Sequence, residues 1–192
     1  MTASDSSAIP PERPQQAFDP FAILGFEPVF ELDPRLLRAR WMRAAAAVHP
    51  DAAGATLLSA KVNDAFRVLS DPLLRAEALL ERFGVNVHAM QDVVRRSLPP
   101  TFLMEMMELR EQIDAIGSDD HVGRSAMRDV AMSRRDAALL EIASAFQRLA
   151  TTSMDTQTQE QTVRTVMESC NVVRSFDRML EQLDREFGVD AR

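Results

Sequence analysis

The fold is decided by the stretch DPRLLRARWMRAAAAVHPDAAGATLLSAKVNDAFRVLSDP, residues 33–72. Asp33 is a favourable N-cap and Pro34 fits the first helical position, so a helix is expected to begin here. Apolar residues at steps of four, three and four predict its buried stripe: Leu37, Trp41, Ala44 and Val48. Pro50 ends this helix soon after a run of four alanines, the best helix-forming residues. A second helix is expected at 56–70, and the short loop between the two predicts an antiparallel hairpin.

The second helix has a regular apolar face, and clear stop signals surround the hairpin. The residues expected on its buried face are Leu58, Val62, Ala65, Phe66 and Leu69. Asp71-Pro72 closes this helix, because the residue before a proline disfavours the helical conformation. A third helical segment, 73–83, ends at Gly84, which suits a left-handed cap. Upstream, Asp19-Pro20 predicts a short helix that Gly25 ends.

Composition favours helices and argues against several classes of protein. Of the 192 residues, 46% are hydrophobic, which is enough for a packed core. The chain has only six glycines and no tyrosine, and its Leu, Ala, Met, Glu and Arg content favours helices over strands. The formal net charge of −7 argues against nucleic-acid binding, which needs a basic surface. We therefore predict an all-α protein that binds no nucleic acid.

The sequence shows no targeting or membrane segment. It has no run of about 18 apolar residues, so no membrane span is expected. Residues 1–17 are rich in Ser, Pro and Gln and are expected to form a disordered tail rather than a secretory signal. Cys170 is the only cysteine, which argues against a disulfide framework and a cysteine-rich zinc site. We expect a cytoplasmic protein without a bound metal or cofactor.

A second helical region follows a weakly patterned stretch at 85–96, which we expect to be a linker. A helix is predicted at 99–116, and after a Gly-Ser-Asp-Asp stop and restart signal at 117–120 a long helix is predicted up to about residue 150. Residues 151–158 are polar and turn-like, and the last helix carries apolar residues at steps of three and four from Val163 to Phe187. Three helices with short connections predict an antiparallel bundle.

Side chains suited to catalysis are few and scattered. His88 and His121 fall in loop-like regions without metal-ligand spacing, and they are expected to be exposed. Cys170 lies on an apolar helix stripe, where a free thiol acts as a small hydrophobe. An enzyme that uses His49 would need acidic, cysteine or further histidine partners, and its own loop supplies only Asp51. An enzyme is therefore disfavoured.

Several stretches resemble a known family when they are taken together. The His-Pro-Asp tripeptide at 49–51, between a basic helix and a returning helix, resembles the loop of J domains in DnaJ-type co-chaperones. The opening and the third helix of HscB-type co-chaperones resemble FDPFAILGFEPVFELDPRLL at 18–37 and KVNDAFRVLSDPLLRAEALLERFGV at 61–85. The start of the HscB C-terminal domain is similar to FLMEMMELREQID at 102–114, which ordinary J proteins do not share. The resemblance covers about residues 18–190.

This resemblance implies an L-shaped, all-α molecule with two domains. The J domain would occupy residues 18–84, as an antiparallel helical hairpin with the His-Pro-Asp loop. Residues 85–96 would be the linker, and a three-helix bundle at 97–190 would form the C-terminal domain.

In J domains the tripeptide contacts a DnaK-type chaperone and favours ATP hydrolysis by that partner. The resemblance assigns this role to His49, Pro50 and Asp51. The preceding helix carries Arg38, Arg40 and Arg43 without an acidic residue, which favours steering toward an acidic chaperone surface. The alternative is that these arginines only solvate the helix. Two neighbours of the tripeptide depart from the family pattern: Val48 stands for an aromatic residue and Ala52 for a lysine.

A helical wheel separates two apolar faces on the first helix of the bundle. One is a complete core stripe: Phe102, Met106, Leu109, Ile113 and Ile116. On another face, Leu103, Met104 and Met107 lie beside Glu108 and Glu111. This is more apolar surface than solubility favours, and methionines suit an adaptable partner surface. The alternative is that the other two helices of the bundle cover this face.

In HscB proteins the matching positions bind IscU, the scaffold on which iron–sulfur clusters are assembled. The resemblance therefore assigns scaffold binding to Leu103, Met104, Met107, Glu108, Glu111 and Val172. Ala115 replaces an acidic residue of the family, which implies a weaker contact at that position. One cysteine cannot supply the usual ligands of a cluster, so the chain is not expected to hold one.

The sequence thus predicts a co-chaperone and not an enzyme. It would bind an IscU-type scaffold, deliver it to a DnaK- or HscA-type chaperone, stimulate the chaperone's ATPase and assist iron–sulfur cluster transfer and maturation. The alternative is a J-domain co-chaperone whose bundle recruits a different client protein.

Overall fold

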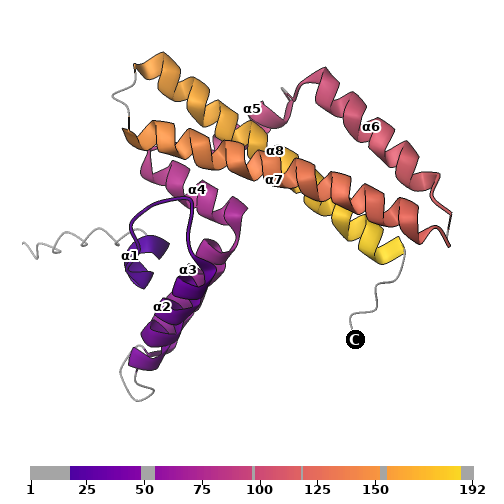
Figure 1. Ribbon diagram of the computed structural model, residues 1–192. Helices are drawn as coiled ribbons and strands as arrows, with labels where there is room; N and C mark the ends of the chain where they lie inside the picture. The colour runs from indigo at the N-terminus through magenta and orange to yellow at the C-terminus, as the bar shows by residue number, and fades with distance from the viewer. Residues whose placement is uncertain (1–17, 49–54, 97, 118, 152–154, 187–192) are drawn as a thin grey trace, which may run out of the picture.

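The chain folds into two arms of α-helices, which Figure 1 shows in a computed structural model. The structure describes residues 18–48, 55–96, 98–117, 119–151 and 155–186. Within these ranges every regular element is an α-helix, so the predicted all-α class is confirmed.

The N-terminal unit contains the four helical segments that the sequence pattern predicts. They are α1 (Pro20–Leu24), α2 (Pro34–Ala47), α3 (Ala55–Ser70) and α4 (Pro72–Arg82). Helices α2 and α3 pack side by side as a hairpin, and α1 lies against α3.

An Asp-Pro pair begins three of these four helices. Asp19, Asp33 and Asp71 are the N-caps, and their carboxylates accept backbone N–H groups of the first turn, two each at Asp19 and Asp71 and one at Asp33. The proline that follows occupies a position where no intrahelical hydrogen bond is lost. Gly25 and Gly84 follow α1 and α4 with φ of 69° and 77°, a left-handed conformation that glycine adopts without strain. These local signals place the helix ends.

Residues 85–96, expected to be a linker, instead form a further helix, α5 (Val87–Arg96). The Asn86 side chain accepts an N–H of the first turn at 3.1 Å, which makes it a cap. Val87 and Val94, seven residues apart and therefore on one face, are buried in the core. Met90 packs against the same core, so apolar residues at steps of three and four do mark the inner face of α5, a pattern that the linker prediction overlooked.

The C-terminal unit consists of α6 (Pro100–Asp114), α7 (His121–Thr151) and α8 (Thr156–Glu186). Figure 1 shows α7 and α8 as a long pair with α6 beside one end of it. Helix α8 begins inside the polar stretch 151–158 that was expected to be a turn. Asp155 explains the difference, because its carboxylate accepts the N–H and the hydroxyl of Thr158 at 2.9 and 2.8 Å.

One hydrophobic core joins the N-terminal helices to the α7/α8 pair. At the boundary, the Phe146 ring of α7 stacks on Phe30, with centroids 5.6 Å apart, and on Phe83 at 6.5 Å. The Arg75 guanidinium lies 5.2 Å from the centre of the Phe30 ring, and burial lowers the pKa of this arginine. We call these four residues the joint. Since the core is continuous across the joint, the two units form one packed body.

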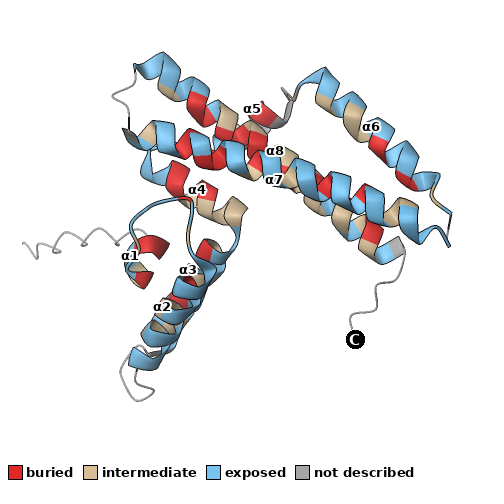
Figure 2. Ribbon diagram, viewed as in Figure 1, coloured by how far each residue is buried: buried red, intermediate tan, exposed pale blue. Residues whose placement is uncertain are grey.

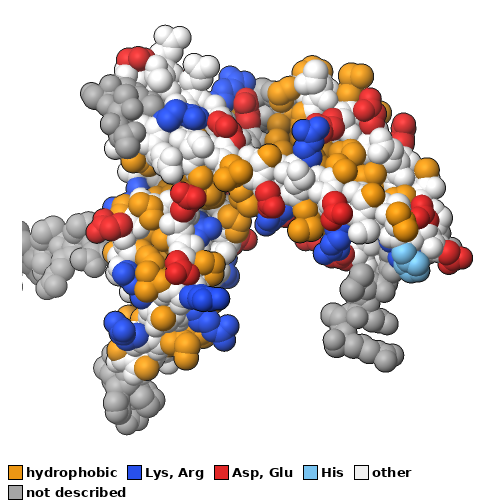
Figure 3. Space-filling view, viewed as in Figure 1, with side chains coloured by type: hydrophobic (Ala, Val, Ile, Leu, Met, Phe, Trp, Pro, Cys, Tyr) orange, Lys and Arg blue, Asp and Glu red, His pale blue; other side chains and the backbone are white. Residues whose placement is uncertain are grey.

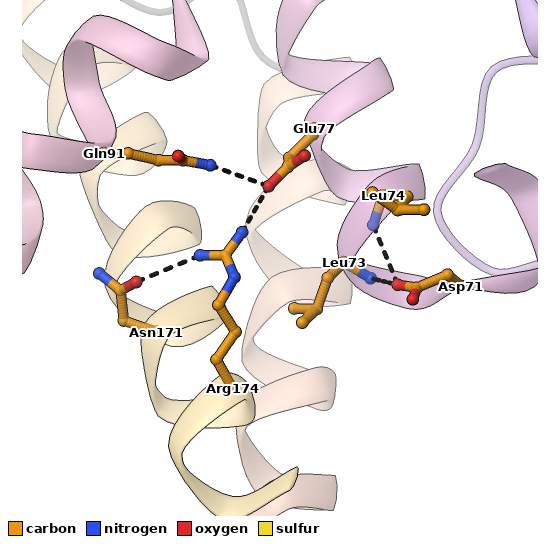
Figure 4. A network of polar contacts seen from close by, with 7 residues as sticks. All are labelled: Asp71, Leu73, Leu74, Glu77, Gln91, Asn171 and Arg174. Atoms are coloured by element: carbon orange, nitrogen blue, oxygen red, sulfur yellow. Dashed lines mark hydrogen bonds and ion pairs between the residues drawn. The ribbon is translucent and has the colours of Figure 1, made fainter. Parts of the chain in front are cut away.

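A polar network crosses the same boundary, as Figure 4 shows. Arg174 of α8 donates hydrogen bonds to Glu77 of α4 and, at 3.2 Å, to Asn171. Gln91 of α5 donates to the same Glu77 oxygen at 2.9 Å. The side chains of Glu77 and Arg174 are only 23% and 24% exposed, so their attraction is partly shielded from solvent. The network ties α4, α5 and α8 together.

A second, smaller core holds α6 against the helix pair. Its buried residues are Leu109, Ile113, Met127, Ala131, Phe176, Met179 and Leu183. Glu105 of α6 also pairs with Arg134 of α7 at 2.7 Å. Figure 2 shows that burial on α6 is confined to a few positions, whereas α7 and α8 bury residues along most of their length. Helix α6 is therefore covered on one side only.

The arms meet at an angle, and the predicted L shape is confirmed. Figure 1 shows the α2/α3 hairpin projecting away from the α7/α8 pair, with α4 at the corner. The tip of the hairpin and helix α6 therefore lie far from each other, on different arms.

Replacing Phe146 with alanine should destabilise the whole protein rather than one arm. The ring is 6% exposed and contacts both units, so the free energy of unfolding should fall by about 3–5 kcal/mol. Urea unfolding followed by circular dichroism measures this change.

The matched control for Phe146 is Leu140→Ala on the same helix, because the Leu140 side chain is 66% exposed. This control should change the free energy of unfolding by less than about 0.5 kcal/mol. If Phe146→Ala lowers the free energy of unfolding as little as Leu140→Ala does, the joint does not stabilise the fold.

Candidate partner-binding surfaces

The tripeptide His49, Pro50 and Asp51 lies outside the described residues, but the helices that carry it are well defined. Helix α2 ends at Ala47, and α3 begins at Ala55. The Trp41 ring stacks on Phe66 with centroids 4.7 Å apart, and its Nε1 donates to Asn63 at 3.0 Å. These contacts between the two helices hold α2 and α3 together as a hairpin.

The three arginines assigned to chaperone binding have different surroundings. Arg38 and Arg43 are exposed on α2. Arg40 is half-buried, donates a hydrogen bond to the Gly25 carbonyl and lies 4.1 Å from the centre of the Phe26 ring. Figure 3 shows Lys and Arg side chains gathered over the arm that α2 and α3 form. Arg38 and Arg43 are available to a partner, whereas Arg40 holds α2 against the α1 loop.

Exposed apolar side chains also lie on the α2/α3 hairpin. Met42 of α2 and Leu57 and Leu58 of α3 are 57%, 64% and 50% exposed. The prediction that Leu58 is buried was wrong, since half of its side chain is exposed. Leu58 follows the same helical period as the buried face, so apolar spacing alone does not distinguish it from the buried residues.

Helix α6 presents the second candidate surface, which we call the α6 patch: Leu103, Met104 and Met107. Their side chains are 49%, 61% and 64% exposed, which confirms that they lie off the core stripe. Leu109 and Ile113 of the stripe are buried, and Phe102, Met106 and Ile116 pack beside them. The alternative that neighbouring helices cover this face is therefore wrong.

The other residues assigned to scaffold binding fall into two groups. Glu108 and Glu111 are exposed beside the α6 patch, so their carboxylates are accessible. Val172 of α8 is half-buried and packs against both cores, so little of its side chain is available. Ala115, next to the end of α6, is exposed.

Groups suited to catalysis do not gather in the part of the chain that the structure describes. Burial raises the pKa of the Cys170 thiol to about 12, so it stays protonated and unreactive near neutral pH. His88 and His121 are exposed as expected, although they lie in α5 and at the start of α7 rather than in loops. Among the described residues no three metal-ligating side chains converge. No helix in these ranges has the length and apolar character to cross a membrane.

Comparisons with known sequences point to one family. A family model described as the HSCB C-terminal oligomerisation domain matches residues 98–167. The co-chaperone protein HscB homolog of Bordetella petrii is 34% identical over 128 residues, covering 62% of this chain and 74% of that protein. The homolog of Vibrio vulnificus strain YJ016 is 36% identical over 110 residues, covering 52% of this chain and 63% of that protein.

Solved structures agree on the fold. The chaperone HscB from Vibrio cholerae gives a TM-score of 0.68 at 24% identity, with coverage of 88% of this chain and 96% of that chain. The human co-chaperone protein HscB gives a TM-score of 0.71 at 19% identity, with coverage of 96% of this chain and 92% of that chain. This likeness shows a J domain followed by a C-terminal helical domain.

The exposed arginines of α2 should contribute to chaperone binding through long-range attraction. Replacing Arg38 and Arg43 together with glutamine should weaken binding of a DnaK-type chaperone and flatten its dependence on salt. Exposed charges are screened over about 8 Å at physiological ionic strength, so affinity of the unaltered protein should fall as salt rises. Titrations at several salt concentrations measure both effects.

Arg40→Gln is the matched control on the same helix. It removes the contacts with Gly25 and Phe26, so it should lower the melting temperature more than the double variant does. If the double variant keeps the salt dependence of the unaltered protein, its arginines only solvate the helix.

The α6 patch should matter little for stability. Changing Leu103, Met104 and Met107 together to alanine should cost much less than Leu109→Ala, because Leu109 is only 8% exposed. A buried leucine truncated to alanine costs about 2–5 kcal/mol. Thermal melts of the two variants compare them directly, and a triple variant that melts as early as Leu109→Ala would mean that the patch is core.

Proposed function

Because the chain belongs to the HscB family of co-chaperones, we propose that it delivers an IscU-type iron–sulfur scaffold to a DnaK- or HscA-type chaperone. In this proposal it also stimulates the chaperone's ATPase and so assists cluster transfer and maturation. The observation that carries it is the α6 patch, an exposed apolar surface on the arm opposite the J-domain hairpin.

The chaperone contact would be made by the loop with His49, Pro50 and Asp51, supported by the exposed cations of α2. Proline fixes its own φ and stiffens a loop, which lowers the entropy lost on binding. An aspartate offers an anion to an arginine of the partner, and histidine offers a hydrogen-bonding ring. The groups that hydrolyse ATP would all belong to the chaperone, so this chain would act by favouring one state of its partner.

The scaffold contact would be made by the α6 patch with Glu108 and Glu111 at its edge. A few central apolar anchors usually dominate an interface, while surrounding charges set orientation and specificity. The exposed methionines suit this role, because their unbranched side chains adapt to the shape of a partner.

The proposal is tested by separating the two activities with two variants. His49→Gln should abolish stimulation of the chaperone's ATPase and leave scaffold affinity unchanged. The triple alanine variant of the α6 patch should remove most scaffold affinity and retain basal stimulation of the ATPase. Steady-state ATPase rates and calorimetric titration with an IscU-type scaffold give the two readouts.

Circular dichroism serves as the control that both variants remain folded. A folded His49→Gln protein that still stimulates the ATPase would contradict the chaperone assignment. Normal scaffold binding by the folded triple variant would contradict the scaffold assignment.

A further inference from the structure

A groove runs between α6 and α8 beside the α6 patch. Its volume is about 460 Å³, and Leu103 and Met107 form part of its wall, so the groove and the patch are continuous. The other apolar residues that line it are Leu98, Phe102, Met106, Ile113 and Met179. The groove therefore extends the exposed apolar surface of α6 into a concave space.

The charged residues of this groove are two arginines, Arg110 from α6 and Arg178 from α8. Both are exposed, and neither has an ion-pair partner among the described residues. The described lining contains no carboxylate, although the chain as a whole carries a net charge of −7. In an acidic protein, an apolar groove whose only charges are positive favours an acidic partner segment.

The charges around α6 are arranged asymmetrically. Leu103, Met107 and Arg110 line the groove, whereas Met104 and Glu108 do not. At about 100° per residue, Met104 and Glu108 lie on the side of α6 that is turned away from the groove. A partner that covers the patch therefore meets positive charge on one side and negative charge on the other, which allows only one orientation.

We propose that the groove is the second half of the scaffold site. It would receive a segment of the scaffold that carries an apolar side chain next to an Asp or Glu carboxylate. The apolar side chain enters between α6 and α8, and Arg110 and Arg178 bind the carboxylate. This inference rests on the proposed function, and continuity between groove and patch is the reason to assign both to one partner.

The test is a calorimetric titration of the full chain with an IscU-type scaffold. Replacing Arg110 and Arg178 together with glutamine should weaken binding about tenfold, which corresponds to about 1.4 kcal/mol, because two ion pairs at an exposed interface are lost. Binding by this variant should also depend less on salt. The double variant Arg148→Gln with Arg164→Gln is the matched control. It also removes two positive charges, but from exposed sites on α7 and α8 that lie outside the groove.

A double-mutant cycle identifies the carboxylate. Scaffold variants with single Asp→Asn or Glu→Gln changes are titrated against the unaltered chain and the arginine variant. One scaffold carboxylate should lose its effect when the arginines are absent, since the two groups interact directly.

The outcomes separate this inference from the proposed function. If the unaltered chain binds the scaffold, the α6 patch variant binds weakly and the arginine variant binds normally, the groove is not part of the site. If the unaltered chain does not bind the scaffold, the proposed function fails and the groove assignment fails with it. If light scattering shows dimers that the arginine variant loses while scaffold affinity is unchanged, the groove receives a second copy of the chain and the inference is overturned.

Discussion

The packing of Phe146 between Phe30 and Phe83 is the contact on which the arrangement of the two arms depends. The three rings come from the loop before α2, the residue that follows α4 and the C-terminal part of α7. Apolar packing supplies free energy but little directionality, so stacking alone would allow the arms to rotate. The hydrogen bonds from Arg174 to Glu77 and from Gln91 to Glu77 add direction, because they require defined angles. Together, ring stacking stabilises the joint and the hydrogen bonds set the angle between the two arms.

Features with a local cause could be predicted from the sequence, and features with a tertiary cause could not. The Asp-Pro pairs mark three helix starts, because cap and proline act within one turn. Helix α5 also carries a local signal, the apolar spacing of Val87, Met90 and Val94, but the core that buries these residues comes from elements distant in the sequence. The joint has no local signal, because its rings come from elements distant in the sequence. In the sequence, Phe146 fits the apolar stripe of its own helix, and no nearby residue indicates that it contacts Phe30 and Phe83.

The candidate surfaces divide along the same line. The exposure of Leu103, Met104 and Met107 could be predicted, because helical periodicity separates them from the core stripe of their own helix. The different roles of Arg38 and Arg40 could not, since the partner of Arg40 lies fifteen residues earlier in the chain, at Gly25. The groove could not be predicted either, because Arg110 and Arg178 line one groove only when α6 lies beside α8.

The rigid joint has a consequence for how two partners meet on this molecule. On the proposed function, a scaffold held on α6 and a chaperone held at the hairpin tip occupy one solid body. Their encounter is then equivalent to a reaction within one molecule, at an effective concentration that the angle of the joint sets. A flexible linker would let the distance between the two partners vary widely, and at most of these distances the partners would not meet. Substitutions at the joint, far from both surfaces, would therefore change the coupling between the partners while leaving the affinity for each one intact.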